Sequence, residues 1–327
     1  MSMLLAALMV AATVGLAPTT EAEMARAGQP VMGTILQVTV VASDSATARS
    51  LADAAVTEAR RWDDVLTTWR AEGELARLNA RAGLGAARIS RELAAALRQM
   101  RQLSAATGGA FDPGVGPLVR VWRRPGPHAT APAGAGGSYI DDAALTLTGD
   151  EAALAAGAAL DAGAIGKGIA LDAIAARLRA GGAAAAFLDF GGSSQLAIGA
   201  PPEAPEGWPV LVAGVLPGSA HGVIALRDAA ASTSQALGAG AEAGPIIDPR
   251  SGMPVRPPLL ATVLAPDATT ADAWSTALIV MGRAGLTQID ASGLAAFMED
   301  ANGSVTTRRF LLQTPRPATW ASARAKP

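Results

Sequence analysis

The chain has 327 residues, half of them hydrophobic, which is enough for one large domain or two ordinary ones. Its net charge of −2 argues against nucleic acid as the main partner. The lack of cysteine excludes disulfides, zinc–thiolate sites and thiol nucleophiles, and the presence of only two histidines, His128 and His221, excludes a histidine-rich metal site.

The first 27 residues are predicted to be a secretory signal peptide or another N-terminal extension. Residues 3–17 are apolar and too short to span a bilayer, as is typical of a signal. Small residues near Ala22 or at 25–27 offer cleavage sites, whereas the usual basic start is missing. We therefore expect an exported or periplasmic bacterial protein, with a disordered or helical extension as the alternative.

Strand and helix signals alternate in the N-terminal half. Residues 33–42 alternate and are β-branched, which predicts a strand. Residues 43–66 predict a long helix with one apolar face, and 73–83 a short helix. A further helix is predicted at 90–109, where glycines end it. Residues 123–138 are rich in Pro, Gly and Ala and predict a surface loop.

The C-terminal half shows mainly short strands, with helices predicted at 167–179 and 270–283. The strands are expected near 139–148, 184–190, 194–199, 209–213, 221–227, 259–265 and 304–313. No regular βαβ rhythm is present, which favours an α+β fold over a doubly wound sheet. We expect one domain of mixed sheets with flanking helices over residues 28–315, followed by a flexible tail at 316–327.

Residues 160–172, LDAGAIGKGIALD, place three glycines and Lys167 where a helix is expected to begin. Backbone N–H groups at a helix N-terminus and a nearby lysine form a good phosphate site. No Ser or Thr follows the lysine at Walker spacing, and the dinucleotide fingerprint does not fit either. The segment is therefore interpreted either as a phosphate cradle or as a tight strand-to-helix turn.

Asp272 and Thr276 lie four residues apart on a predicted helix, so they share a face. A carboxylate and a hydroxyl on one face can ligate a hard cation such as magnesium, with waters and substrate phosphates completing the shell. The alternative is helix capping, in which Thr270 or Asp272 starts the helix.

Three glycine- or proline-rich segments carry weaker signals. GGAFDPGVGPLVRVW (108–122) is either a loop that folds over a flat ring or an ordinary turn. FLDFGGSSQLAIG (187–199) suggests a hairpin or bulge. GPIIDPRSGMPV (244–255) predicts a strand that ends in a tight turn, with Asp248 first, Pro249 second and Gly252 at the close.

Taken in order, these segments resemble the ApbE family, the FAD:protein FMN transferases. The motifs that carry the resemblance are Met32-Gly33-Thr34, TTWRAEGELARLN (67–79) with Trp69 before a short Leu-Asn helix, FDPGVGPL (111–118), DAGAIGKG (161–168), Gly-Gly (191–192), DPRSGMPV (248–255) and ADAWSTA (271–277). Together they cover about residues 31–300. The resemblance implies a T-fold-like α+β domain.

In this family, a Thr hydroxyl of an acceptor flavoprotein attacks the FMN-side phosphate of FAD; AMP leaves and FMN stays attached. Some members instead hydrolyse FAD to FMN and AMP. The resemblance therefore implies FAD as substrate, magnesium as cofactor and a flavoprotein with a target Thr as partner. It also implies peripheral contact with membrane-bound redox proteins.

The resemblance also implies roles for individual residues. FAD would be contacted by Met32, Trp69, Ala110, Phe111, Asp112, Asp161, Lys167 and Ile246. The metal would be held by the backbone oxygen of Ala164, by Asp272 and by Thr276. Asp272, Thr276 and Lys167 would carry the catalysis.

The chain departs from the family pattern where proton transfer is concerned. The family usually has a His directly before the Ile-x-Asp-Pro-Arg turn, and Pro245 stands there. Proline has no side-chain proton to exchange, so it cannot substitute. The family's Thr-Ser-Gly reads 233–235 Thr-Ser-Gln, and Gly114 replaces a hydroxyl residue. The alternatives to transfer are therefore a catalytically impaired FAD-binding protein and a magnesium-dependent FAD pyrophosphatase.

Overall fold

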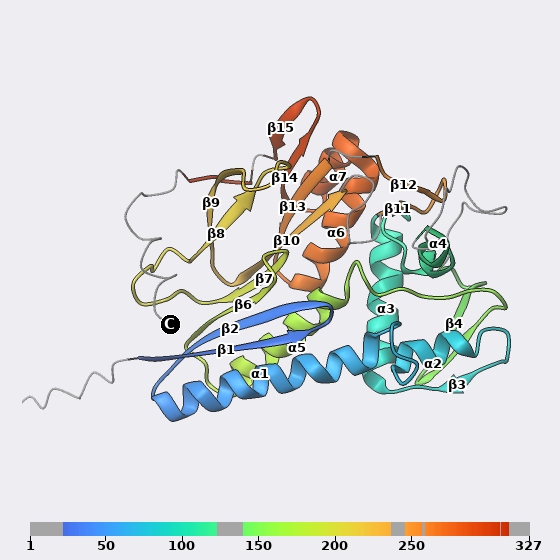
Figure 1. The fold of residues 1–327 in the computed structure, drawn as a ribbon, viewed down its shortest axis with the longest axis horizontal. Coiled ribbons are helices and arrows are strands. Elements are labelled where there is room, and N and C mark those ends of the chain that lie inside the picture. Colours follow the sequence, from blue (N-terminus) through green and yellow to red (C-terminus); the bar gives the residue numbers. More distant parts are fainter. Residues whose placement is uncertain (1–21, 123–139, 237–245, 257–258, 308, 314–327) are drawn as a thin grey trace, which may run out of the picture.

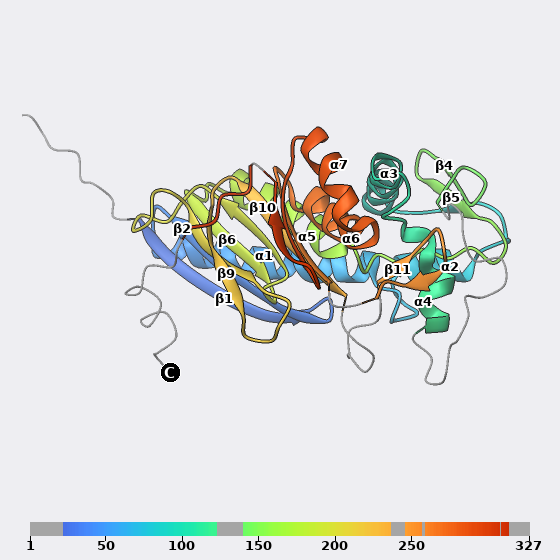
Figure 2. The same ribbon diagram turned by 90° about the horizontal axis from the view of Figure 1, so that it is seen from above.

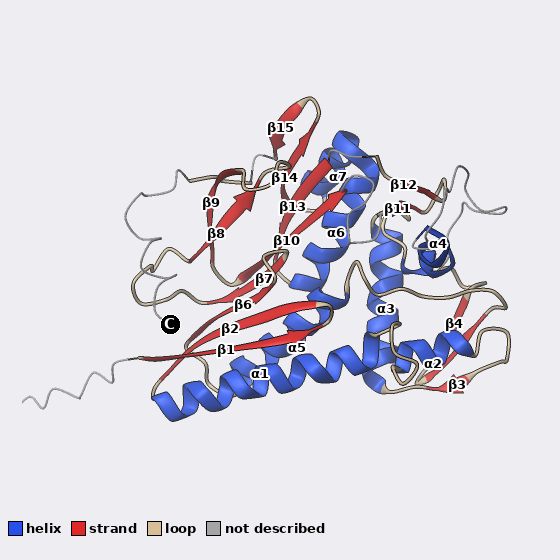
Figure 3. Ribbon diagram, in the orientation of Figure 1, coloured by secondary structure: helices blue, strands red, loops and turns tan. Residues whose placement is uncertain are grey.

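The computed structural model describes residues 22–122, 140–236, 246–256, 259–307 and 309–313. The loop predicted at 123–138, the tail beyond 313 and Pro245 lie outside the described residues. The described elements form an α+β domain of antiparallel sheets and flanking helices, as the sequence predicted (Figures 1 and 3). No helix in these ranges is long and apolar enough to cross a membrane.

The largest sheet of the described residues has eight strands in the order β1-β2-β6-β7-β10-β13-β14-β15. These strands span Glu23–Val31 (β1), Thr34–Ala42 (β2), Ala185–Phe190 (β6), Ser194–Ile198 (β7), Ala229–Ala236 (β10), Leu259–Ala265 (β13), Ala295–Asp300 (β14) and Gly303–Thr306 (β15). Every neighbouring pair is antiparallel. Strand β10 therefore lies in the interior of the sheet, between β7 and β13.

Strand β1 begins at Glu23, inside the segment predicted to be a signal or extension. It pairs with β2 along its whole length, from Glu23↔Ala42 to Val31↔Thr34. The domain therefore starts before residue 28, because residues 23–27 belong to the hydrogen-bonded ladder. Of the two predicted cleavage positions, the one near Ala22 leaves this strand intact, whereas the one at 25–27 lies within it.

Helices Ser45–Leu66 (α1), Gly166–Ala180 (α5) and Ala268–Met281 (α6) pack on one face of this sheet (Figure 2). Their apolar side chains share the main core with those of the strands. Helix α1 begins after Asp44, whose carboxylate accepts from the Thr47 N–H at 2.8 Å. Helix α6 begins after Asp267, which accepts from the Thr270 N–H at 2.7 Å. These caps fix the start of each helix, and in α6 the cap places Asp272 in the second turn.

The opposite face of the sheet is covered by a two-stranded ribbon of Trp208–Ala213 (β8) and Ala220–Leu226 (β9). A second apolar cluster fills the space between ribbon and sheet. In this cluster the Trp208 ring stacks on Phe187 of β6, with ring centroids 5.5 Å apart.

The remaining elements gather at one end of the molecule, on the right in Figure 1, or flank α6. The end is formed by Glu74–Ala80 (α2), Arg91–Ala106 (α3), Pro113–Val115 (η1), Gly116–Trp122 (α4), the hairpin Ile247–Asp248 (β11) and Met253–Pro254 (β12), and a sheet of Ala87–Arg88 (β3), Glu151–Leu154 (β5) and Leu145–Thr148 (β4). Gly282–Ala284 (η2) and Gly285–Ala291 (α7) follow α6.

The predicted helices and most predicted strands are confirmed within a few residues. The predicted last strand at 304–313 is wrong in extent, because β15 ends at Thr306 and Gln313 forms only an isolated bridge with Val223. The strand predicted at 139–148 is likewise shorter, since β4 begins at Leu145.

Candidate functional site

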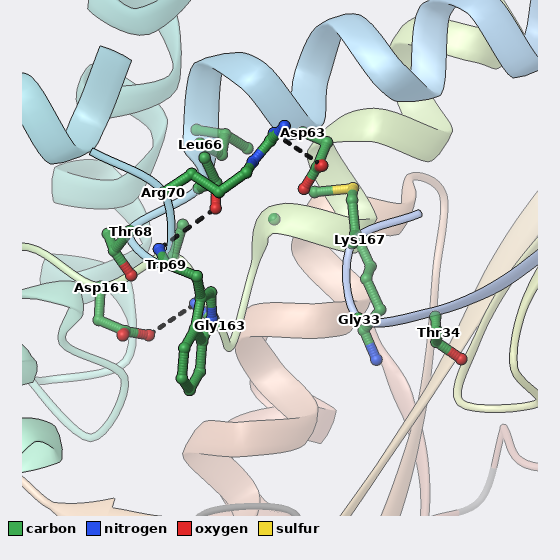
Figure 4. A pocket seen from close by; sticks show the side chains of 14 residues that line it. Gly33, Thr34, Asp63, Leu66, Thr68, Trp69, Arg70, Asp161, Gly163 and Lys167 are labelled. Atoms are coloured by element: carbon green, nitrogen blue, oxygen red, sulfur yellow. Dashed lines mark hydrogen bonds and ion pairs between the residues drawn. The ribbon is translucent and has the colours of Figure 1, made fainter. Parts of the chain in front are cut away.

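A cavity of about 550 Å³ lies where three segments meet: the β1–β2 turn, the end of α1 with the chain after it, and the loop that opens α5. We call it the glycine-loop cavity; its walls come from residues 32–34, 63–70 and 161–167. Figure 4 shows Trp69, Asp161 and Lys167 along it. All of them belong to segments that the sequence singled out.

The β1–β2 turn is built from two residues in the left-handed region, Met32 (φ 52°) and Gly33 (φ 74°). Such a pair gives a two-residue hairpin turn that matches the twist of the strands. Glycine adopts this conformation freely, whereas Met32 is strained in it. Because both residues line the cavity, the strain lies at the site itself.

Trp69 lies between the glycine-loop cavity and a second cavity of about 500 Å³, which we call the adjoining cavity. The side chain is 76 % exposed, which is unusual for so large an apolar group. Thr68, Trp69 and Asp161 line both cavities, so the two spaces meet at these residues. Arg70, next in the chain, pairs with Asp63 at 2.9 Å.

The glycine loop is held in shape by backbone groups. The Asp161 N–H donates to the Pro113 carbonyl at 2.7 Å, and the Asp161 carboxylate accepts from the Gly163 N–H at 2.8 Å. Lys167, in the first turn of α5, donates to the Ser193 hydroxyl at 2.5 Å. The helix N-terminus and the ammonium group therefore lie together beside the cavity, as a phosphate cradle requires.

Asn79 is a residue of this site that the sequence reasoning missed. Its side-chain amide donates to the Leu160 carbonyl and accepts from the Leu160 N–H, both at 2.8 Å. The two bonds tie α2 to the residue directly before Asp161. Its sequence signal was the Leu78-Asn79 pair that ends the motif TTWRAEGELARLN, from which only Trp69 was selected.

Asp189 stands at the end of β6, beside the Gly-Gly turn. Burial raises the pKa of this carboxyl, and the Gly192 N–H, Gln195 and the charge of Lys167 oppose that rise. The Gly192 N–H donates to Asp189 at 2.7 Å, and Gly191 and Gly192 both have positive φ. The turn therefore places Ser193 where its hydroxyl accepts a hydrogen bond from Lys167.

Asp272 is 4 % exposed, and its carboxylate accepts three hydrogen bonds from described residues. The Gly168 N–H donates to Oδ2 at 2.8 Å, while the hydroxyls of Ser194 and Ser232 donate to Oδ1 at 2.8 and 2.5 Å. The capping interpretation is wrong for Asp272, because Asp267 is the N-cap of α6. The carboxylate instead joins α6 to α5, β7 and β10.

The magnesium ligands implied by the resemblance fit this arrangement. A carboxylate offers about four lone-pair directions, of which these donors use three. Gly168 directs its N–H to Asp272 and not to the carbonyl of Ala164, four residues earlier. Asp272, Thr276 and that carbonyl are all hard oxygen donors, the type that magnesium binds together with waters and phosphates. No group of three or more His, Asp or Glu side chains among the described residues could hold a metal.

The structure buries the 110–112 segment, and its predicted contacts with FAD stay predictions. Ala110 and Phe111 are each 2 % exposed and belong to the hydrophobic core, so they do not line either cavity. Asp112 is buried as well and accepts from the Gly114 N–H at 2.7 Å. The next residue, Pro113, accepts from the Asp161 N–H through its carbonyl, so this part of the chain helps to hold the glycine loop in place.

The DPRSG turn closes the β11–β12 hairpin. The Gly252 N–H donates to the Asp248 carbonyl at 2.8 Å, and Gly252 has a φ of +68°. The indole N–H of Trp122 donates to the Gly252 carbonyl at 2.8 Å. This hydrogen bond attaches the turn to α4. Ile246 is half-buried against the core and does not line either cavity, so its contact with FAD stays a prediction.

Comparison with known proteins identifies the family of the chain. The model of the ApbE family matches residues 28–298, so the chain belongs to the ApbE family. A Rhodobacter capsulatus protein named FAD:protein FMN transferase is 32 % identical over 274 residues, which cover 77 % of this chain but 50 % of the relative. The chain thus spans about half the length of that relative. A Salmonella typhimurium protein of the same name is 29 % identical over 297 residues, covering 82 % of this chain and 81 % of the relative.

Solved structures share the fold. The apo form of the Pseudomonas stutzeri flavinyl transferase ApbE superposes with a TM-score of 0.74 at 25 % identity, covering 88 % of this chain and 94 % of the other. The ApbE protein of Thermotoga maritima gives a TM-score of 0.75 at 22 % identity, with coverage of 88 % and 97 %. At that identity, the second likeness concerns the fold alone.

Proposed function

We propose that the protein is a magnesium-dependent FAD:protein FMN transferase. The names of the sequence relatives support this function. The observation that carries it is the N-terminus of α5, where Lys167 lines the glycine-loop cavity while the next residue, Gly168, binds Asp272. One helix end thus joins a phosphate cradle to a metal ligand. The two cavities on either side of Trp69 suit a ligand with two ring systems, such as FAD.

The reaction forms one bond and breaks one. The hydroxyl oxygen of an acceptor Thr bonds to the FMN-side phosphorus, and the bond from that phosphorus to the bridging oxygen breaks. AMP leaves with the bridging oxygen, and the Thr proton passes to a base or to solvent. Such a displacement depends on positioning and on neutralising the pyrophosphate charge.

The residues of the site meet these two needs. Lys167 and the N–H groups at the start of α5 place positive charge beside the cavity. Asp272, Thr276 and the Ala164 carbonyl would hold magnesium, which neutralises phosphate charge when it is bound. Trp69 offers an exposed aromatic face on which a flavin or adenine ring can stack.

A second candidate function rests on Pro245, which stands where the family usually has a His. Without a general base the rate falls by about 10²- to 10⁴-fold. The protein would then bind FAD without transferring FMN efficiently. Hydrolysis of FAD to FMN and AMP uses the same bond changes, with water in place of the acceptor hydroxyl.

We further propose that the protein is exported and acts on a flavoprotein with a target Thr, including acceptors in membrane-bound redox proteins. The apolar segment at 3–17 supports export. Periplasmic fractionation of an untagged chain, with N-terminal sequencing of the product, tests this. A product that begins near Glu23 is expected, whereas retention in the cytoplasm contradicts it.

The function is tested by incubating the purified protein with FAD, Mg²⁺ and an acceptor domain that contains a target Thr. Flavin that stays on the acceptor after denaturation supports transfer, while free FMN and AMP without acceptor support hydrolysis. Bound but unchanged FAD supports the binding role, and the absence of FAD binding would exclude all three functions. Pro245→His should raise the transfer rate if the missing base limits it.

The metal assignment is tested by Asp272→Ala, with Asp290→Ala as the control, because Asp290 is an exposed carboxylate on α7. Asp272→Ala should abolish Mg²⁺-dependent turnover, and the control should keep it. Full turnover in Asp272→Ala would show that the metal is held elsewhere.

A further inference from the structure

A row of hydroxyl groups fills the contact between α6 and β10. Ser232 and Ser234 alternate along β10, so both side chains lie on the face that meets α6. The Ser234 hydroxyl lies 2.8 Å from that of Ser275 and 3.1 Å from that of Thr276. Ser275 is completely buried and donates to the backbone carbonyl of Asp272 at 2.9 Å.

The direction of these hydrogen bonds follows from the group at the end of the row. A carbonyl oxygen can only accept, so the single proton of Ser275 points to Asp272 O. Ser275 can then only accept at its 2.8 Å contact, which makes Ser234 the donor there. By the same reasoning Ser234 accepts at its other contact, and Thr276 is the donor. Every proton in the row points toward Asp272.

We propose that Ser234 and Ser275 are positioning residues for Thr276. They take up the one proton of the Thr276 hydroxyl, which leaves its lone pairs to face a cation. A hydroxyl proton that pointed toward the cation would repel it. The hydrogen bonds of Ser234 and Ser275 therefore orient the Thr276 hydroxyl as a metal ligand. The inference rests on the proposed function, because it gives these serines a purpose only if Thr276 binds a metal.

Ser232 and Ser194 complete the arrangement around the other ligand. Both donate to Asp272 Oδ1, and Ser275 lies 3.4 Å from Ser232. The hydroxyls of Ser194 and Ser232 therefore stabilise the Asp272 carboxylate, while that of Ser275 binds its backbone carbonyl. The middle residue of the Thr-Ser-Gln sequence at 233–235 thus acquires a role that the sequence alone did not suggest.

The test compares Ser234→Ala with Ser234→Thr, which keeps the hydroxyl, and with Thr233→Val as the matched control. Thr233 is the next residue of β10, but its hydroxyl pairs with Thr262 of β13 at 2.8 Å on the other face of the sheet. Mn²⁺ serves as the probe: electron paramagnetic resonance measures free Mn²⁺ in the presence of protein saturated with FAD. Flavin fluorescence in EDTA measures FAD affinity without metal.

Ser234→Ala should weaken Mn²⁺ binding about three- to tenfold, the range that the net free energy of one hydrogen bond converts to. Its FAD affinity in EDTA should stay unchanged, and Ser234→Thr and Thr233→Val should bind Mn²⁺ as the wild type does. In a Thr276→Val background, Ser234→Ala should have no further effect, because the serine acts through Thr276.

The two proposals fail in different ways. If the wild type with FAD binds no Mn²⁺, the metal-dependent function itself is refuted. If the wild type binds Mn²⁺ and Ser234→Ala binds it equally well, only the positioning role is refuted. An effect of Ser234→Ala that persists in the Thr276→Val background refutes action through Thr276.

Discussion

At Gly168 the backbone of α5 lies close to the backbone of α6, and we expect Gly168→Ala to disturb both the fold and the metal site. A Cβ atom at this position would lie 2.4 Å from the carbonyl oxygen of Ala268 and 2.8 Å from the Cα of Thr269. Ordinary contacts begin at 3.4 Å, so the two helices must separate by about 1 Å. The obstructing atoms are backbone, which cannot rotate away as a side chain can.

Opposing effects decide the magnitude. Alanine is a better helix former than glycine by about 1 kcal/mol, which alone predicts a more stable protein. Overpacking costs about 1–3 kcal/mol, and stretching the bond from the Gly168 N–H to the buried Asp272 carboxylate costs about 1.5 kcal/mol more. The net result is a loss of about 1.5–3.5 kcal/mol in the free energy of unfolding. The melting temperature should fall by about 3–14 °C.

Differential scanning calorimetry of the wild type, Gly168→Ala and Gly166→Ala checks this prediction. Gly166 is the control because a Cβ there would meet only side-chain atoms, the closest being Met32 Cε at 3.3 Å. We expect Gly166→Ala to change stability by less than about 1 kcal/mol. The reasoning is refuted if Gly168→Ala is as stable as the wild type, since helix propensity would then outweigh the contact.

Three further changes probe other parts of the molecule. Asn79→Ala removes the hydrogen bonds to both backbone groups of Leu160, so thermal unfolding should show a loss of about 2 kcal/mol in the free energy of unfolding. Flavin titration should show a weaker affinity for FAD. No change in either measurement would contradict the role of Asn79. Met32→Gly should lower FAD affinity with little change in stability. Relief of the left-handed strain at Met32 offsets the greater conformational freedom that glycine gives the unfolded chain. A wild-type affinity for FAD would show that Met32 does not belong to the site. The Arg283 guanidinium lowers the pKa of Asp300 to about 2, so this carboxyl stabilises the fold above about pH 4, and the gain is lost as the pH falls to about 2. Asp300→Asn should therefore melt earlier than the wild type at pH 7, and the difference should shrink as the pH falls from about 4 toward 2. A difference of unchanged size at pH 2 would have another cause.

Periodicity predicted the elements whose burial follows a regular pattern. The long helices α1 and α3 each bury one apolar face, and strand β13 is buried throughout. Strand β10 was missed because its sequence, AAASTSQA, is small and polar, although it lies inside the sheet. Strand β1 was missed because Gly28 and Pro30 weaken its signal. As an edge strand it tolerates both residues.

The candidate site was predictable only as far as local spacing reaches. The i,i+4 spacing by itself places Asp272 and Thr276 on one helix face. The donors to Asp272 come from α5, β7 and β10, and no sequence pattern relates positions 40 to 104 residues apart. The same limit applies to Phe111, since a loop motif does not reveal that its side chain belongs to the core.

The burial of Asp272 itself argues for a ligand. A buried carboxylate loses hydration, and an apolar side chain would fill the same space at lower cost in stability. The chain nevertheless provides Gly168 N–H, Ser194 and Ser232 to hold this side chain in place. Packing does not require such a charge, whereas the proposed binding of a cation and of phosphates beside Lys167 would use it. The binding part of the site thus depends on many groups from four elements, whereas proton transfer would depend on the single side chain at position 245. Under the proposed function, a chain with Pro245 would therefore keep FAD and metal affinity while it loses rate, and the Pro245→His variant measures that difference directly.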